Sequence, residues 1–195
     1  TVVFVHPVGP FPGVRCKRTV LDQYLPGSVA ESETVVSPGD EYGYHVVSFL
    51  PVRRVVIPRR ITDAVATHVE SEHPHEAGGF LACERRGGHL HATDHVPLSN
   101  DADRPRRRFV TTVDERVPPE PRICYHSHTS PATVSGMTKI DRQKIPERYA
   151  LVVFAPHGEP YSYRVFQRTL LRWRELPVGR RSTESDRWIP LPRLS

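Results

Sequence analysis

Residues 123–141 read ICYHSHTSPATVSGMTKID, and the fold that we expect for the chain is built around this segment. Its opening segment, 123–128, predicts a central strand that carries two histidines at its end. Side chains two positions apart leave the same face of a strand, so His126 and His128 point together while the serine between them points away. A loop then runs to Asp141. The three side chains are either the legs of a metal site or polar residues on one loop, and the stretch alone leaves both interpretations open.

Short apolar segments on either side of this stretch predict the rest of a mixed sheet, with glycine- and proline-rich turns between them. The expected strands are 52–58, 75–83, 89–98, 107–113, 149–156 and 161–167. A helix is predicted at 59–74, because Ile61, Val65 and Val69 recur on a single face. A short helix after the loop and another at 169–176 complete the pattern of an α/β sandwich.

The chain is expected to have three parts. Residues 1–50 are rich in proline and glycine, with brief strand signals at 2–5 and 45–50, and are predicted to form an irregular N-terminal arm. The main domain is predicted to span 51–175, followed by an extended tail at 176–195. The composition of the arm fits a cover for a cleft, a dimer contact or a completion of the sheet, so a homodimer stays among the alternatives.

Composition restricts the class of protein. The 195 residues are 37% hydrophobic, which matches one ordinary domain. The net charge of +5 comes from basic residues in short scattered groups, without an aromatic-interleaved basic stripe, so we expect no nucleic-acid partner. Cys16, Cys83 and Cys124 lie far apart, which argues against a disulfide framework and favours a cytoplasmic protein. We expect neither a signal peptide nor a membrane span, because no apolar run is long enough.

The histidine stretch contains most of a metal site of the hydrolytic kind. His126, His128 and Asp141 offer two ring nitrogens and one carboxylate oxygen, a set that would leave one position of a zinc ion open for water. Such a site also requires a base that takes and returns a proton. The best candidate is Glu76 in PHEAGG at 74–79, where two glycines would let the backbone pass close to a ligand.

The order PHEAGGFLAC, PLSN, FVTTVDE, YHSHT and YALVVF, with an aspartate after the histidines, resembles the JAMM (MPN-plus) metallopeptidase family. The resemblance covers about 52–167. It implies an MPN (cytidine-deaminase-like) three-layer sandwich, in which helices flank a mixed sheet. It also implies that Glu76 is the general base and acid and that His126, His128 and Asp141 bind zinc (Zn2+).

The family also has a hydroxyl three residues before its aspartate, which helps to stabilise the tetrahedral oxyanion. Thr138 occupies that position here, with Ser135 as a rival. Asp141 lies two residues farther from His128 than the family pattern places it, and Lys139, which cannot ligate as an ammonium, stands at the family's position. The loop must therefore bulge by two residues to deliver Asp141.

One structural alternative and one other candidate ligand group stand beside these roles. The threonine and the aspartate have the spacing of a helix capping box, which would make the aspartate a structural residue. A second histidine pair, His89 and His91 with Asp94 and His95, has ligand chemistry too, although it falls where the family has an ordinary strand.

The resemblance implies a zinc-dependent metallopeptidase or isopeptidase that cuts after the C-terminal Gly-Gly of a ubiquitin-like or sulfur-carrier protein. A tail without side chains suits a narrow cleft, because it can pass through as an extended strand. One alternative within the enzyme class is a bacterial deubiquitinase-like enzyme, which removes a ubiquitin-like modifier from a target. An alternative of another class is a catalytically inactive MPN scaffold or binding module.

Overall fold

The structure, a computed structural model, describes residues 2–5, 51–181 and 187–194. All of them belong to one compact unit, Thr1–Pro7 with Leu50–Ser195. The first strand signal of the predicted arm is confirmed as β1 (Val2–Val5). The rest of the arm, including the second strand signal at 45–50, lies outside the described residues.

Among the described residues, nine strands form one mixed sheet in the order β11-β10-β2-β4-β3-β6-β7-β8-β9. Their bounds are β2 (Arg54–Val56), β3 (Gly78–Arg86), β4 (His89–Leu98), β6 (Arg122–His128), β7 (Tyr149–Phe154), β8 (Ser162–Arg168), β9 (Trp173–Leu176), β10 (Val178–Arg181) and β11 (Trp188–Pro190). A separate two-stranded sheet pairs β1 in parallel with β5 (Phe109–Thr112). Every strand that the sequence predicts between 52 and 167 is present, with its ends moved by a few residues.

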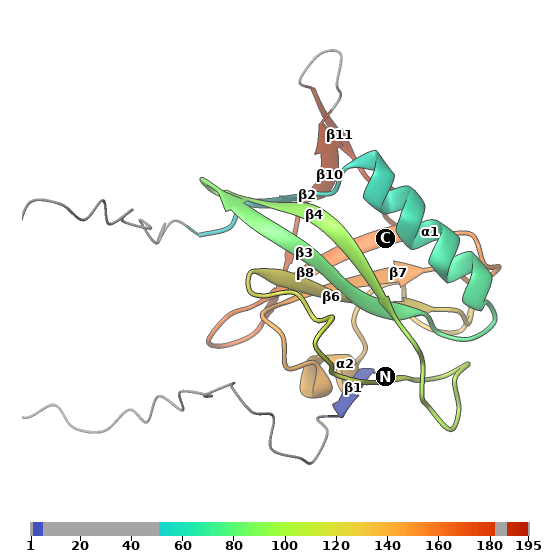
Figure 1. Cartoon of the computed structure of the whole chain (residues 1–195). Coiled ribbons are helices and arrows are strands. Elements are labelled where there is room, and N and C mark those ends of the chain that lie inside the picture. Colours follow the sequence, from blue (N-terminus) through green and yellow to red (C-terminus); the bar gives the residue numbers. More distant parts are fainter. Residues whose placement is uncertain (1, 6–50, 182–186, 195) are drawn as a thin grey trace, which may run out of the picture. The chain divides into compact units, whose positions relative to one another are not determined.

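One face of the large sheet is covered by α1 (Arg59–Glu72), as Figure 1 shows. The helix forms because its apolar residues recur every four positions, and Ile61, Val65 and Val69 are all buried against the sheet. It ends before Pro74, which lacks the N–H that a further turn needs. The helix predicted from this spacing is therefore confirmed.

The two faces of the sheet carry separate hydrophobic cores. Tyr125 of β6 lies in the core beneath α1, and its neighbour Cys124 lies in the core of the opposite face, as the alternation of a strand requires. This second core contains Phe80, Leu98, Phe109, Cys124, Met137, Ile145, Ala150, Val152 and Phe166. Because Phe109 belongs to β5 and Ile145 follows α2 (Lys139–Lys144), the small sheet and α2 cover this second face.

The large sheet is strongly curled, like half of a barrel (Figure 1). Two hydrogen bonds join segments from opposite ends of the strand order. The Tyr163 N–H in β8 donates to the Pro192 carbonyl beyond β11 at 2.9 Å, and the Arg174 side chain in β9 donates to the Val52 carbonyl before β2 at 3.0 Å. The curl thus buries residues from both ends of the sheet in one core.

The C-terminal part differs from the prediction. The sequence predicts a helix at 169–176, but the structure has β9 there, so this prediction is wrong. Residues 176–195, expected to form a tail outside the main domain, contribute β10 and β11 to the sheet and bury Leu191 in the core. These strands form because the curled sheet offers edges for them to pair with, a tertiary contact that overrides local propensity.

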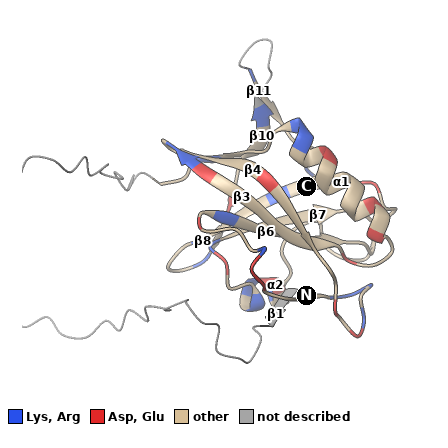
Figure 2. Cartoon of the chain, in the orientation of Figure 1, with Lys and Arg blue, Asp and Glu red and all other residues tan. Residues whose placement is uncertain are grey.

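The described part of the chain is a mixed α/β fold dominated by the curled sheet, which fits the α/β class predicted from the sequence. Its two helices are α1 and the six-residue α2. Neither is long and apolar enough to cross a lipid bilayer. Lysine and arginine residues are spread over several elements in Figure 2 and do not gather in one stripe.

Candidate metal centre

Strand β6 lies in the middle of the sheet and ends at the candidate metal ligands. It pairs antiparallel with β3 and parallel with β7, so that His126 lies between Gly78 and Val152 while His128 lies beside Phe154. Both imidazoles are buried, with 0% and 1% of the residue surface exposed. The strand directs both rings to the face opposite α1, as their spacing predicts.

Asp141 reaches the two histidines from the first turn of α2. Thr138 is the N-cap of this helix: its hydroxyl accepts from the Asp141 N–H, and the Asp141 carboxylate accepts from the Thr138 N–H at 2.8 Å. The predicted capping box is therefore confirmed. The same oxygen, Asp141 Oδ2, lies 3.6 Å from His126 Nε2 and 3.4 Å from His128 Nε2. The longer loop does not keep Asp141 away from the histidines.

The three side chains form a compact group whose ligand atoms lie within 4.8 Å of one another. His128 Nδ1 is 2.8 Å from the Val134 carbonyl, which can only accept, so this nitrogen carries the proton and donates it. The lone pair of His128 Nε2 therefore points toward His126 Nε2 at 3.0 Å and toward the Asp141 carboxylate. Electron-rich atoms gathered in this way suit a cation, and the group can hold a metal ion.

The surroundings of His126 and Asp141 keep these two groups in the forms that bind a metal. Burial lowers the pKa of His126 to about 4, although the Asp141 carboxylate opposes this shift. Burial also opposes the ionisation of Asp141, but its contacts with His126, His128 and Thr138 outweigh burial and hold the pKa of this carboxyl well below its usual range. A neutral imidazole and an ionised carboxylate are the ligating forms.

Glu76 is buried at the same end of the sheet, just before β3. Its N–H donates to the Pro105 carbonyl at 2.7 Å, and the next N–H, that of Ala77, donates to the Ser127 hydroxyl at 2.8 Å. Burial raises the pKa of Glu76, and the charge of Asp141 acts in the same direction. These bonds fix the backbone that carries the glutamate, and a buried carboxyl with a raised pKa is suited to accept a proton and return it.

Asn100 connects the loop between β4 and β5 to Glu76. Its side-chain amide donates to the Glu76 carbonyl at 2.7 Å and to the Arg108 carbonyl at 3.0 Å. Its side-chain oxygen accepts from the N–H groups of Ala102 and Val110, at 3.1 Å each. One half-buried side chain thus fixes both ends of this loop against the backbone of the glutamate.

Gly78 and Gly79 have a role different from the ligand approach that the sequence predicts. A Cβ on Gly78 would lie 2.7 Å from the ring of Phe109, and a Cβ on Gly79 would collide with the Val96 carbonyl of β4. A side chain at Gly79 would push β3 away from β4, and one at Gly78 would displace the ring of Phe109. The two glycines therefore allow the close packing that places the preceding glutamate.

A cleft of about 640 Å3 opens over the metal group. Glu76, His128 and Thr138 line it, whereas His126 and Asp141 are completely buried beneath its surface. Prolines and small hydroxyl residues make up much of the remaining lining. The volume lies in the range of sites that hold small ligands, so it can admit a few residues of an extended peptide.

The two candidate oxyanion hydroxyls lie in different places. Thr138 lines the cleft, and its Oγ1 is 2.7 Å from Asp141 Oδ2. The hydroxyl of Ser135 instead donates to the Leu194 carbonyl at 3.3 Å and accepts from the Arg164 guanidinium at 3.4 Å. The structure brings Thr138 together with the metal group and directs Ser135 toward the C-terminal segment.

The second histidine pair lies on β4. The rings of His89 and His91 are 6.1 Å apart, while His95 Nε2 is 2.6 Å from the hydroxyl of Tyr125. The exposed Asp94 accepts a hydrogen bond from the backbone N–H of His95. In the part of the chain that the structure describes, these four side chains form no convergent ligand group.

Sequence reasoning missed three residues that support the site. Ser127 carries no signal of a metal ligand, because its side chain points to the opposite face of the strand from the histidines; from that face its hydroxyl accepts from the Ala77 N–H. Val134 acts through its carbonyl, which carries no sequence signal. Asn100 stands at the end of PLSN after an expected strand, and an asparagine that bonds to the backbone of a turn was a signal that could have found it.

No family model and no curated protein matches this chain. Chains of solved structures do match. One is the solution structure of a protein from Desulfitobacterium hafniense, a structural genomics target, with 16% sequence identity and a TM-score of 0.49. The match covers 68% of this chain and 98% of that chain. Because the likeness is low, the function must be inferred from the geometry of the site.

Proposed function

We propose that this chain is a zinc-dependent metallopeptidase of the JAMM (MPN-plus) type, which cuts after the C-terminal Gly-Gly of a ubiquitin-like or sulfur-carrier protein. The observation that carries the proposal is the convergence of His126, His128 and Asp141 beneath a cleft that Glu76 lines. On this proposal the curled sheet with α1 and α2 is a form of the MPN three-layer sandwich.

The donor set favours zinc among the common divalent ions. His126 and His128 supply nitrogen and Asp141 supplies oxygen, a combination that zinc accepts, whereas calcium and magnesium prefer oxygen alone. Zinc held there supplies a Lewis acid, which acidifies water and polarises a carbonyl. The Val134 carbonyl and the capping box orient His128 and Asp141 before any ion binds, so little reorganisation opposes binding.

Glu76 is the proton carrier of the proposed reaction. It takes a proton from the attacking water as the oxygen–carbon bond forms, and it delivers that proton to the leaving nitrogen as the peptide bond breaks. Thr138 is the better placed oxyanion donor, because Ser135 is engaged elsewhere. Its hydroxyl must first leave Asp141 Oδ2, so we assign it a smaller effect than Glu76.

The capping box favours one alternative of another class, a metal-free MPN scaffold. The cap alone gives Asp141 a structural reason to be present. It does not account for the two buried histidines whose ring nitrogens face the same carboxylate, which is why we favour the enzyme. A deubiquitinase-like enzyme shares this chemistry and differs in its substrate.

Proteolysis of defined substrates tests the proposal. The zinc-loaded full chain is incubated with ubiquitin-like and sulfur-carrier proteins that continue beyond Gly-Gly, and mass spectrometry locates the cut. We expect cleavage after the second glycine, reduced about 100- to 10,000-fold by Glu76→Gln, the usual worth of a general base. That variant should keep its zinc. Bound zinc without cleavage, or cleavage that ignores Glu76→Gln, contradicts the proposal.

A further inference from the structure

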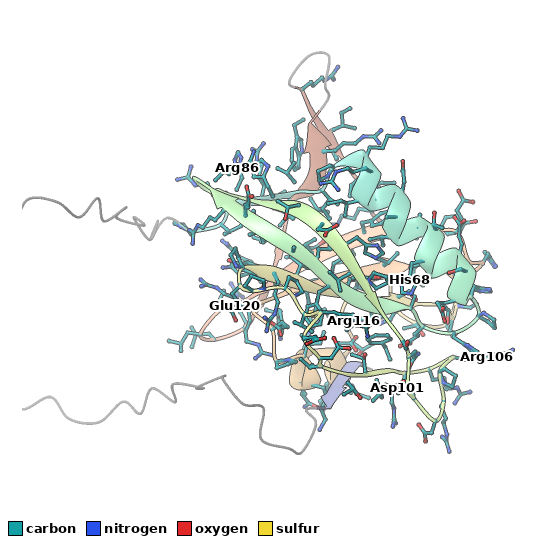
Figure 3. The ribbon with its side chains drawn as sticks, in the orientation of Figure 1. His68, Arg86, Asp101, Arg106, Arg116 and Glu120 are labelled. Atoms are coloured by element: carbon teal, nitrogen blue, oxygen red, sulfur yellow. The ribbon has the colours of Figure 1, made fainter. Side chains whose placement is uncertain are left out.

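The loop that joins β4 to β5 places two arginines at the mouth of the cleft. Arg106 and Arg107 line it together with Glu76 and His128. The other two arginines of the loop are used differently: Arg104 does not line this cleft, and Arg108 lies 3.8 Å from Asp103. Figure 3 labels Arg106 on this loop.

The backbone of the two arginines is anchored, and within the described part of the chain their charges are not neutralised. Among the described residues, neither Arg106 nor Arg107 has an ion pair. Their backbone is anchored, because the carbonyl of the preceding Pro105 accepts from the Glu76 N–H and Asn100 holds both ends of the loop. The backbone of both arginines is therefore held next to that of the proposed proton carrier, while their side chains stay exposed to solvent.

Two guanidinium groups that no described acidic side chain neutralises, beside a peptide-sized cleft, suit a carboxylate, which each fork can bind through two hydrogen bonds. Building on the proposed function, we infer that Arg106 and Arg107 bind the C-terminal carboxylate of the substrate. The scissile bond then lies near a free chain end, and a short C-terminal piece is released. A target protein joined through an isopeptide bond offers no carboxylate there, so this subsite selects trimming over deconjugation.

Three peptides that share one Gly-Gly segment test this inference on the zinc-loaded full chain. They end in Gly-Gly-Ala as the free acid, in Gly-Gly-Ala amide and in Gly-Gly-Asp amide. We expect kcat/KM to be about tenfold higher for the free acid than for either amide, the low end for charge-assisted hydrogen bonds at an exposed site. The double variant Arg106→Ala with Arg107→Ala should remove this preference. Arg104→Ala, which deletes one charge from the same loop, should keep it.

Each other outcome has a definite meaning. Equal cleavage of all three peptides overturns the carboxylate subsite and leaves the peptidase intact. If the aspartyl amide is cleaved as fast as the free acid, the arginines bind an acidic side chain as well as a chain end, which overturns selection for the chain end. If no peptide is cut, the proposed function fails on these substrates, and calorimetry with Glu76→Gln decides the subsite. Equal affinity for free acid and amide then overturns it, and tighter binding of the acid, lost in the arginine variant, supports it.

Discussion

On each face of β6 two histidines lie around one oxygen, from α1 and β4 on one face and from β6 itself on the other, but the two groups differ in chemistry. Beneath α1, the Tyr125 hydroxyl lies 2.8 Å from His68 Nδ1 and 2.6 Å from His95 Nε2. On the opposite face, the Asp141 carboxylate lies 3.6 Å and 3.4 Å from the Nε2 atoms of His126 and His128, respectively. A hydroxyl can donate to one imidazole and accept from the other, whereas an ionised carboxylate can only accept.

This difference separates a structural cluster from a site. The tyrosine completes the hydrogen bonds of its two histidines without any ion. The carboxylate faces two ring nitrogens that are only 3.0 Å apart, one of which has its proton committed to the Val134 carbonyl. A proton or a metal ion must therefore complete the group on the cleft side. Counting histidines does not distinguish the two faces, but the donor capacity of the central oxygen does.

Matched histidine variants on the two faces give the largest expected contrast. Elemental analysis of the purified chain should find about one zinc ion, as a single site of this donor set predicts. His128→Gln should lose most of it, because a ligand is removed, while His95→Gln should keep it. Equal zinc in both variants would mean that the histidines of β6 are not ligands, and no zinc in the parent would favour the scaffold alternative.

Asn100→Ala tests how much the loop between β4 and β5 contributes to stability on the cleft face of the sheet. The change removes the partners of the Glu76 carbonyl and of two backbone N–H groups, so we expect the free energy of unfolding to fall by about 1–3 kcal/mol. Ser99→Ala, at the exposed neighbouring position, should change it by less than about 0.5 kcal/mol. Urea unfolding measures both, and similar values for the two variants would show that the asparagine does not hold the loop.

Tyr125→Phe tests whether the cluster beneath α1 is purely structural. It leaves His68 and His95 without their shared partner, and because both imidazoles are only half-buried we expect a loss of about 1 kcal/mol in unfolding free energy. Zinc content should not change, although Tyr125 directly precedes His126 in the chain. A loss of zinc would mean that the two faces are coupled through β6.

The pH dependence of stability should show the smallest effect. Burial lowers the pKa of His95 to about 4, with His68 acting in the same direction, so folding opposes its protonation. The unfolded chain binds this proton near the ordinary value of 6.5, and stability is therefore lost as the pH falls from about 6.5 toward 4. In metal-free protein, the unfolding free energy of His95→Gln should therefore fall less steeply than that of the parent as the pH drops through this window. If the two proteins show the same slope of unfolding free energy against pH, His95 does not cause the loss.

The amino-acid sequence predicts the strands and α1 well because both depend on local periodicity. Ile61, Val65 and Val69 recur at helical spacing, and the run at 149–156 is apolar enough to be a central strand wherever the chain places it. The helix predicted at 169–176 fails because β9 exists only by pairing with β8. The two strands are consecutive in the chain and are joined by a short turn, in which the Thr169 N–H donates to the Arg172 carbonyl at 2.8 Å, and their pairing overrides the local helical pattern.

The candidate site likewise contains features that local spacing predicts and features that depend on the fold. The spacing of His126 and His128 predicts that their rings share a face, and the threonine–aspartate spacing predicts the cap at Thr138, because both follow from the geometry of one strand or one helical turn. Whether Asp141 is a cap residue or a ligand was open in the sequence. In the folded chain its carboxylate caps α2 and also faces the two histidines, because α2 lies on the second face of the sheet.

The order of amino acids is enough to predict which residues can perform the chemistry and which local elements present them. Which two histidines meet a carboxylate, and which meet the hydroxyl of Tyr125, depends on the folded chain. Folding also brings Glu76 under the loop of Arg106 and Arg107, through hydrogen bonds to Pro105 and Asn100. Such contacts join residues far apart in the chain, and their geometry depends on the packing of the whole sheet.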